Sequence, residues 1–192
     1  EKEVRFTVVY TGSLYGSVQT ARPFLEALRQ ALESDQLSPD EIRVRFIGNP
    51  SVEAPQLVTE WGLEAVVEFL GYLPHQQVIG HQLAADVLLL ILGEHPNSDI
   101  VLPGKTFEYL YSGRPILAVV PDGVTRDVLR EAGVGRFAHP GRPEDICSLI
   151  LKLYDQWQRG ELSATGNPEI IANYDRRQQA KQLAAIFDEL DK

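Results

Sequence analysis

Six short segments of the chain are rich in β-branched and aromatic residues. Most of them are too continuously apolar to leave one face in water, which is typical of strands buried in a parallel sheet. We therefore predict six buried strands, over residues 4–10, 42–48, 65–71, 86–92, 115–120 and 135–139.

Between these segments, apolar residues recur with the spacing of an α-helix. The regular alternation of strand and helix predicts an α/β fold: a doubly wound parallel sheet of about six strands, joined by right-handed crossovers. The predicted helices cover residues 21–33, 54–61, 76–84, 105–111, 125–132 and 143–158.

The pattern changes after Gly160. Residues 160–169 have the composition of a loop, and residues 170–192 predict one last helix. We therefore divide the chain into an α/β domain, residues 1–160, and a helical appendage, residues 161–192. An apolar stripe on the last helix is expected to pack either on this domain or on a missing amino-terminal domain. The stripe consists of Leu183, Ile186, Phe187 and Leu190.

Acidic residues outnumber basic ones. The 192 residues include 27 Asp and Glu against 18 Lys and Arg, so the formal net charge is -9. No basic surface is therefore expected, and nucleic acid is not a predicted partner. A compact anion such as a diphosphate is still compatible with this charge, because helix N-terminal amides and one or two cations bind it locally.

A reducing compartment is expected, because Cys147 is the one cysteine and cannot form an internal disulfide. No cysteine and histidine cluster predicts a metal site, and no cofactor is expected. The longest apolar run, residues 87–92, is too short to span a membrane, so we predict a cytoplasmic protein. The sequence has no initial methionine and reads as a piece of a longer protein. Any peripheral contact with the inner membrane is assigned to the missing part.

Ligands of doubly wound sheets bind outside the carboxyl ends of the strands, so the loops there are the first places to look. After the first strand, Gly12 and Gly16 let backbone amides approach an anion, although their spacing matches neither a dinucleotide-binding nor a Walker loop. After the fourth strand, residues 93–104 form a long polar loop of the kind that carries function. Its His95 is the one histidine placed where a substrate would meet it.

Lys105 and Glu108 are three residues apart and so share one face of the predicted helix 105–111. Two interpretations stay open from the residues alone. The pair is a surface ion pair worth about a few tenths of a kcal/mol. Alternatively, Lys105 and the first amides of the helix hold phosphate, while Glu108 accepts hydrogen bonds from vicinal hydroxyls, as acidic residues do in dinucleotide folds.

The segment KTFEYLYSGRPILAVV, residues 105–120, resembles a pattern of retaining nucleotide-sugar glycosyltransferases of the GT-B type (group 1, family 4-like). That pattern, E-x-L-x-x-G-x-P-V/I, lies in their carboxyl-terminal domain. The likeness continues in order through residues 8–28, 44–50, 67–91 and 130–153. It implies a Rossmann-like domain that binds a nucleotide-diphosphate sugar, with a UDP-sugar expected first and a GDP-sugar next. An amino-terminal domain, missing from this chain, would bind the acceptor.

The resemblance also implies roles for individual residues. Glu108 takes the place of the second glutamate of an E-x7-E motif, which holds the donor ribose. The donor diphosphate is assigned to Gly12, Ser13, Pro103, Gly104 and Lys105. The base is assigned to Tyr72, Leu73 and Pro74, and the donor sugar to His95 and Ile100.

Two features depart from the family pattern. Ile100 stands where the family often has its first glutamate, which touches the donor sugar or helps its departure. Ser13 and Val18 stand where an arginine and a lysine commonly neutralise the diphosphate, so Lys105 is expected to take over part of that role. No catalytic residue is assigned.

The main prediction is the donor-binding half of a retaining hexosyltransferase that acts in glycan or cell-surface polysaccharide synthesis and is inactive alone. A non-hydrolysing sugar-nucleotide epimerase shares the two-domain architecture, and Glu94 and His95 would supply the groups it needs around the sugar. The third alternative is a non-catalytic α/β module that binds a partner through its last helix.

Overall fold

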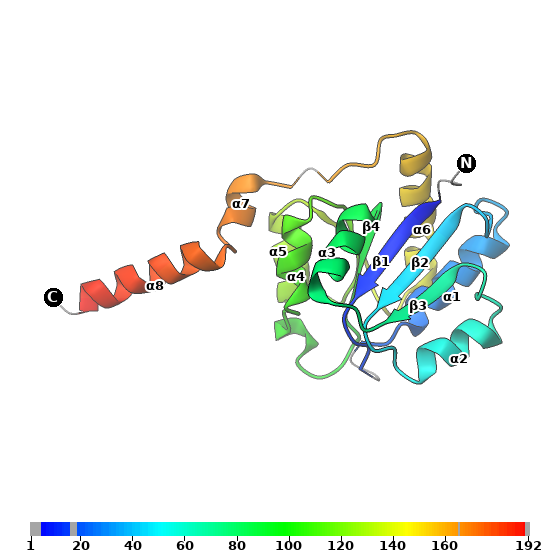
Figure 1. Ribbon diagram of the computed structural model, residues 1–192, viewed down its shortest axis with the longest axis horizontal. Coiled ribbons are helices and arrows are strands. Elements are labelled where there is room, and N and C mark those ends of the chain that lie inside the picture. The colour runs from blue at the N-terminus through cyan, green and yellow to red at the C-terminus, as the bar shows by residue number, and fades with distance from the viewer. Residues whose placement is uncertain (1–4, 16–18, 165, 191–192) are drawn as a thin grey trace.

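One parallel sheet forms the centre of the protein, with strands in the spatial order β3-β2-β1-β4-β5-β6 (Figure 1). The computed structural model describes residues 5–15, 19–164 and 166–190; Gly16 and Val18, named in the sequence analysis, lie outside these ranges. The predicted six-stranded doubly wound sheet is confirmed. Its strands are β1 (Phe6–Thr11), β2 (Ile42–Ile47), β3 (Val67–Gly71), β4 (Val87–Ile91), β5 (Ile116–Val119) and β6 (Gly135–Ala138).

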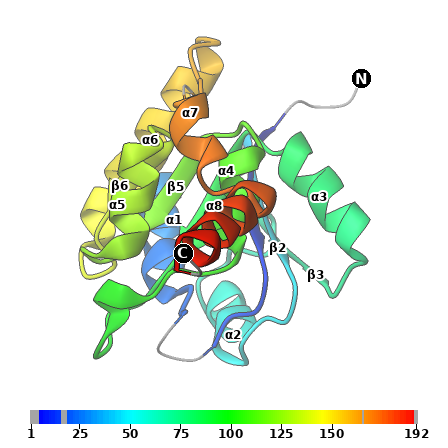
Figure 2. The same ribbon diagram turned by 90° about the vertical axis from the view of Figure 1, so that its left-hand side faces the viewer.

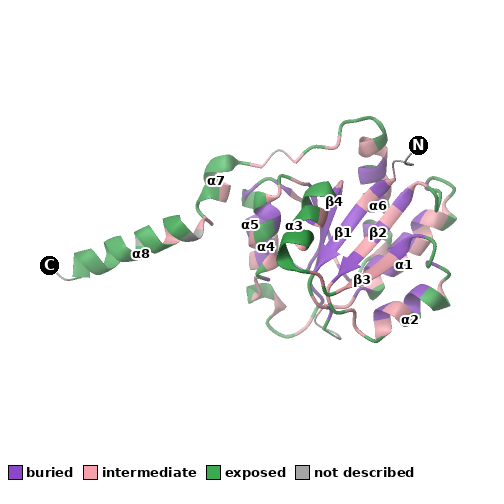
Figure 3. Ribbon diagram, viewed as in Figure 1, coloured by how far each residue is buried: buried purple, intermediate pink, exposed green. Residues whose placement is uncertain are grey.

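Helices cover both faces of the sheet. One hydrophobic cluster joins the sheet to α1 (Arg22–Glu33), α2 (Glu53–Glu60) and α6 (Pro143–Gln158). Another joins the opposite face to α4 (Lys105–Tyr111) and α5 (Val124–Glu131), with α3 (His75–Ala84) beside them. The central strands β1, β4 and β5 are buried between the two layers, whereas most residues of the edge strands β3 and β6 are only half-buried (Figure 3).

The central strand β4 shows why its sequence is apolar at every position. Its side chains alternate between the two clusters, with Leu89 and Ile91 in one and Leu88 and Leu90 in the other. All four are at most 1% exposed. Because both faces are covered, neither set of alternating positions meets water.

The strand order places a topological switch point between β1 and β4. From β1 the chain winds outward through β2 to β3, and it then returns to β4 on the other side of β1. The loops after β1 and β4 therefore lead in opposite directions, which leaves a crevice at the carboxyl edge of the sheet.

The C-terminal segment differs from the prediction of a single helix. It forms two helices, α7 (Pro168–Ala172) and α8 (Arg176–Leu190). The break is at Asp175, whose Oδ1 accepts hydrogen bonds from the backbone N–H groups of Arg177 (2.7 Å) and Gln178 (3.2 Å). An aspartate in this position caps a new helix, so the single-helix prediction is wrong there.

The two C-terminal helices relate differently to the domain. Helix α7 is anchored, since Tyr111 donates a hydrogen bond to the Ile171 carbonyl and the rings of Phe107 and Tyr174 lie 5.7 Å apart. Helix α8 extends away from the sheet (Figure 1) and is seen nearly end-on in Figure 2. Its apolar stripe is exposed, with Phe187 58% accessible. What covers the stripe stays a prediction.

Candidate functional site

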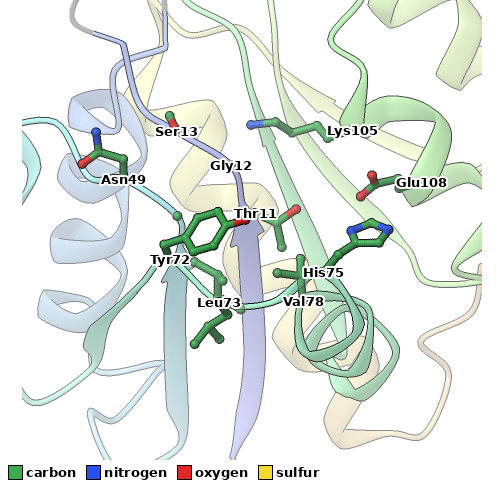
Figure 4. A pocket seen from close by; sticks show the side chains of 12 residues that line it. Thr11, Gly12, Ser13, Asn49, Tyr72, Leu73, His75, Val78, Lys105 and Glu108 are labelled. Atoms are coloured by element: carbon green, nitrogen blue, oxygen red, sulfur yellow. The ribbon is translucent and has the colours of Figure 1, made fainter.

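A cavity of about 320 Å³ opens at the carboxyl edge of the sheet, beside the switch point (Figure 4). Its walls come from the ends of β1, β2 and β3 and from the first residues of α3 and α4. The cavity is lined by Thr11, Gly12, Ser13, Ile47, Gly48, Asn49, Tyr72, Leu73, His75, Val78, Lys105 and Glu108.

Two glycines bring the loops after β1 and β2 into backbone contact. Gly12 and Gly48 have φ angles of 107° and 128°, which side chains rarely tolerate. A Cβ atom on Gly48 would lie 2.3 Å from the Gly12 carbonyl oxygen. The Gly12 N–H also donates to the Ile47 carbonyl at 2.7 Å. The cavity wall at this point is therefore backbone, held by contacts that only glycine permits.

Lys105, the first residue of α4, reaches back across the cavity to β1. Its Nζ donates a 2.7 Å hydrogen bond to the Tyr10 hydroxyl and lies 4.0 Å from the centre of the Tyr10 ring. It also lies close over Gly12, where a Cβ atom would be 2.8 Å from Nζ. The lysine thus sits beside the first loop, at the position where the predicted diphosphate would pass.

The partners of Lys105 leave its charge poorly compensated. Burial lowers the pKa of the Lys105 ammonium to about 7, although the nearby Glu108 acts in the opposite direction. Tyr10 is fully buried, and burial raises the pKa of its hydroxyl, so the group that accepts from Lys105 is neutral. An anion that entered the cavity would supply the opposite charge that Lys105 lacks.

Glu108 lies one turn further along α4 and points to a different part of the cavity (Figure 4). Its Oε2 accepts a 3.1 Å hydrogen bond from the Gln82 amide. Within the described ranges, the ion pairs of the protein involve arginines and His139, and Lys105 and Glu108 do not form one. The surface ion pair, one of the two interpretations left open by the sequence, is therefore not observed.

The structure brings together some of the predicted site residues. Those that line the cavity are Gly12, Ser13, Tyr72, Leu73, Lys105 and Glu108. Those that do not line it are Pro74, His95, Ile100, Pro103 and Gly104. Two further residues line the cavity to which the sequence assigned no role, Asn49 after β2 and His75 at the start of α3.

The long loop after β4 leans toward α5, which separates His95 and Ile100 from the cavity. Residues Ser98–Ile100 form a short 3₁₀ helix, and the Gly123 backbone packs so closely on Asp99 that a Cβ atom would lie 2.3 Å from the Asp99 carbonyl oxygen. Thr125 donates a 2.5 Å hydrogen bond to the Val101 carbonyl. Ile100 itself is 72% exposed. The two residues assigned to the donor sugar therefore lie on the α5 side of this edge.

The described residues supply neither a metal cluster nor a membrane span. Within those ranges, no group of three or more His, Cys, Asp or Glu side chains is placed to hold a metal ion. None of the helices described there combines the length and the apolar composition needed to cross a bilayer.

Comparison with known proteins decides the family. The family model described as "Glycosyl transferases group 1" matches residues 5–156. The chain belongs to this family. No protein of curated function has a sequence that matches it.

Solved structures share the fold of this glycosyltransferase family member. Anabaena HepE, in complex with UDP and glucose, aligns with a TM-score of 0.74 and 19% identity, over 96% of this chain and 48% of HepE. The C-terminal domain of LpcC from Francisella tularensis aligns with a TM-score of 0.61 and 15% identity, over 90% of this chain and 88% of that domain. The chain therefore spans about half the length of HepE and most of the LpcC domain. These likenesses confirm the predicted Rossmann-like fold of a GT-B carboxyl-terminal domain.

Proposed function

We propose that this chain is the donor-binding domain of a retaining glycosyltransferase, which moves a sugar from a UDP-sugar to an acceptor hydroxyl in glycan or polysaccharide synthesis. The observation that carries the proposal is the placement of Lys105 and Glu108. One turn apart on α4, they line one cavity, and Lys105 lies beside the glycine turn of the first loop.

The diphosphate is assigned to the region between Lys105 and Gly12. A desolvated ammonium attracts an anion strongly, and the exposed Gly12 backbone has no side chain of its own to keep phosphate oxygens away from it and from Lys105. As the bond to the sugar breaks, negative charge develops on the leaving diphosphate. Lys105 stabilises that charge, which is the main contribution of this domain to the reaction.

The ribose is assigned to Glu108, and the base to the wall formed by Tyr72 and Leu73. A carboxylate accepts hydrogen bonds from two vicinal hydroxyls, so Glu108 orients the donor. It acts at the ribose and is not proposed as a base for the acceptor. UDP is favoured because HepE, which shares the fold, was solved with UDP and with UDP-glucose.

The acceptor and any group that removes its proton are assigned to an amino-terminal domain, as in the family that the sequence resembles. The domain described here is therefore expected to bind donor nucleotide and to transfer no sugar alone. A GDP-sugar is the second candidate donor.

Titration calorimetry with UDP, GDP and ADP tests this function. We expect UDP to bind most tightly and Glu108→Ala to bind UDP about 10- to 100-fold more weakly, because a hydrogen bond to a charged group contributes about 1.5–3 kcal/mol. Glu94→Ala, an exposed glutamate at the same edge but outside the cavity, is the matched control and should bind UDP like the parent. Equal UDP affinity in Glu108→Ala and the parent would contradict the ribose role. Absence of binding by all three nucleotides would contradict donor binding.

A further inference from the structure

Helix α3 buries a glutamine while two of its apolar residues stay exposed. Gln82 is 2% exposed and is the buried residue of this helix, whereas Ile79 and Leu83 are 37% and 48% exposed. An amphipathic helix usually turns its apolar side chains inward. A buried amide is destabilising unless its hydrogen bonds are satisfied, so this arrangement requires partners for Gln82.

The Gln82 amide finds two partners on different elements. Its Nε2 donates 3.1 Å hydrogen bonds to Thr11 Oγ1, at the end of β1, and to Glu108 Oε2, on α4. Both Thr11 and Glu108 line the cavity. One buried nitrogen therefore links the two sides of the switch point.

Thr11 is itself fixed from the interior. The Tyr109 hydroxyl, which is fully buried, accepts a 2.9 Å hydrogen bond from the Thr11 N–H and lies 3.2 Å from Thr11 Oγ1. The same hydroxyl lies 3.3 Å from the Leu89 carbonyl in β4. The hydrogen-bond network formed by Gln82, Thr11 and Tyr109 thus runs from the sheet to Glu108.

This network restrains the side chain of Glu108, and an exposed glutamate without such a restraint is mobile. An exposed glutamate has three rotatable bonds. A ligand that binds only one rotamer loses affinity, because fixing the side chain costs conformational entropy. Gln82 occupies one acceptor position of the carboxylate and leaves the others available for hydroxyl groups. Because the amide only donates through Nε2, it meets Glu108 as a hydrogen-bond acceptor, the role that a diol also requires of the carboxylate.

We infer that Gln82 is a positioning residue for the donor: its amide holds the Glu108 carboxylate in the orientation that recognises the ribose hydroxyls. This inference rests on the proposed function, since it assumes that a nucleotide occupies the cavity. It adds that recognition of ribose depends on a residue that is itself buried beneath the ligand.

The test compares UDP with 2′-deoxy-UDP by calorimetry, in the parent chain and in Gln82→Met. Methionine keeps the length and unbranched shape of glutamine but donates no hydrogen bond. The parent should prefer UDP by about tenfold, in line with a hydrogen bond to a charged group. In Gln82→Met the preference should fall to about threefold or less, and in Glu108→Ala it should disappear.

Two further variants separate positioning from a structural role. Gln77→Met, on the exposed side of the same helix, is the matched control and should keep the tenfold preference. Gln82→Glu keeps the size of the side chain but places a carboxylate against Glu108, and it should lose the preference as well. Thermal unfolding reports whether each variant is folded, and the ratio of the two affinities does not depend on stability.

The outcomes distinguish this inference from the proposed function. If the parent binds neither nucleotide, the proposed function fails. If the parent prefers UDP but folded Gln82→Met and Gln82→Glu keep the same preference, the proposed function stands and the positioning role of Gln82 is wrong.

Discussion

Two cavities at the same edge of the sheet differ in the partners of their charged side chains, which are charged in one cavity and neutral in the other. The second cavity, of about 580 Å³, lies beyond β4 and β6 and is polar. There Arg126 pairs with Asp122 at 2.8 Å, Arg142 with Asp145 at 3.6 Å, and His139 lies 3.5 Å from Glu94. In the first cavity, Lys105 and Glu108 are held by the neutral groups of Tyr10 and Gln82.

The two cavities therefore differ in how strongly their charged side chains can interact with a ligand. A ligand that enters the second cavity must compete with an opposite charge for each cation. A ligand that enters the first meets a cation and an anion whose partners are dipoles, so their attraction for opposite charge or for hydroxyl groups is largely retained. A larger polar cavity is therefore the weaker candidate for an anionic ligand.

The largest effect is expected from a substitution in the wall of the first cavity. Gly48→Ala places a Cβ atom 2.3 Å from the Gly12 carbonyl oxygen, at a φ of 128°. Both loops must shift, so we expect the free energy of unfolding to fall by about 2–4 kcal/mol and UDP affinity to fall at least about tenfold. Urea unfolding and calorimetry measure the two effects.

Gly80→Ala is the matched control for that change. Gly80 lies inside α3, and no atom of the residues that the structure describes stands within 4 Å of a Cβ atom there. Alanine in a helix is favoured over glycine by about 0.5–1 kcal/mol, so this variant should be slightly more stable and bind UDP normally. If Gly48→Ala had the stability and the UDP affinity of the parent, the backbone contact between Gly48 and Gly12 would not shape the cavity.

The next effect is a change in pH dependence. The Lys105 pKa of about 7 lies below its ordinary value of 10.5. A bound diphosphate favours the protonated form, so affinity should be constant below about pH 7 and fall by up to about tenfold per pH unit above it. Lys105→Met should bind about tenfold more weakly at pH 6 and lose this dependence.

UDP-glucose is the probe for this titration, because its diphosphate has no proton to lose near neutral pH. Arg142→Met, which removes a cation from the second cavity, is the control and should keep the parental profile. A parental affinity that does not change between about pH 6 and 8.5 would contradict the titration of Lys105 on which this prediction rests.

The smallest effect is expected in the second cavity itself. Asp122→Asn removes the partner of Arg126, but Asp122 is 89% exposed. Exposed pairs contribute about 0.2–1 kcal/mol, so the free energy of unfolding should change by about 0.5 kcal/mol or less. UDP affinity should stay within about twofold of the parent. A tenfold change in UDP affinity would mean that both cavities take part in binding. This result would contradict the proposed difference between them.

The hydrophobic pattern determined the architecture. The six apolar runs are the six strands, and each predicted helix from 21–33 to 143–158 lies within a residue or so of an observed one. The spacing of Lys105 and Glu108 also puts them on one helical face, whatever that helix packs against. These are short-range properties, because burial on two sides and helical period are both written in neighbouring residues.

Only the tertiary structure decided what those side chains meet. Lys105 turns to Tyr10, 95 residues away, and Gln82 reaches Thr11, 71 residues away. No local pattern distinguishes Gln82 from an exposed glutamine such as Gln77, because a polar residue can be buried only where partners from other elements satisfy it. For the same reason the sequence placed His95 and Ile100 at the correct edge of the sheet, while packing of their loop on α5 kept them out of the cavity.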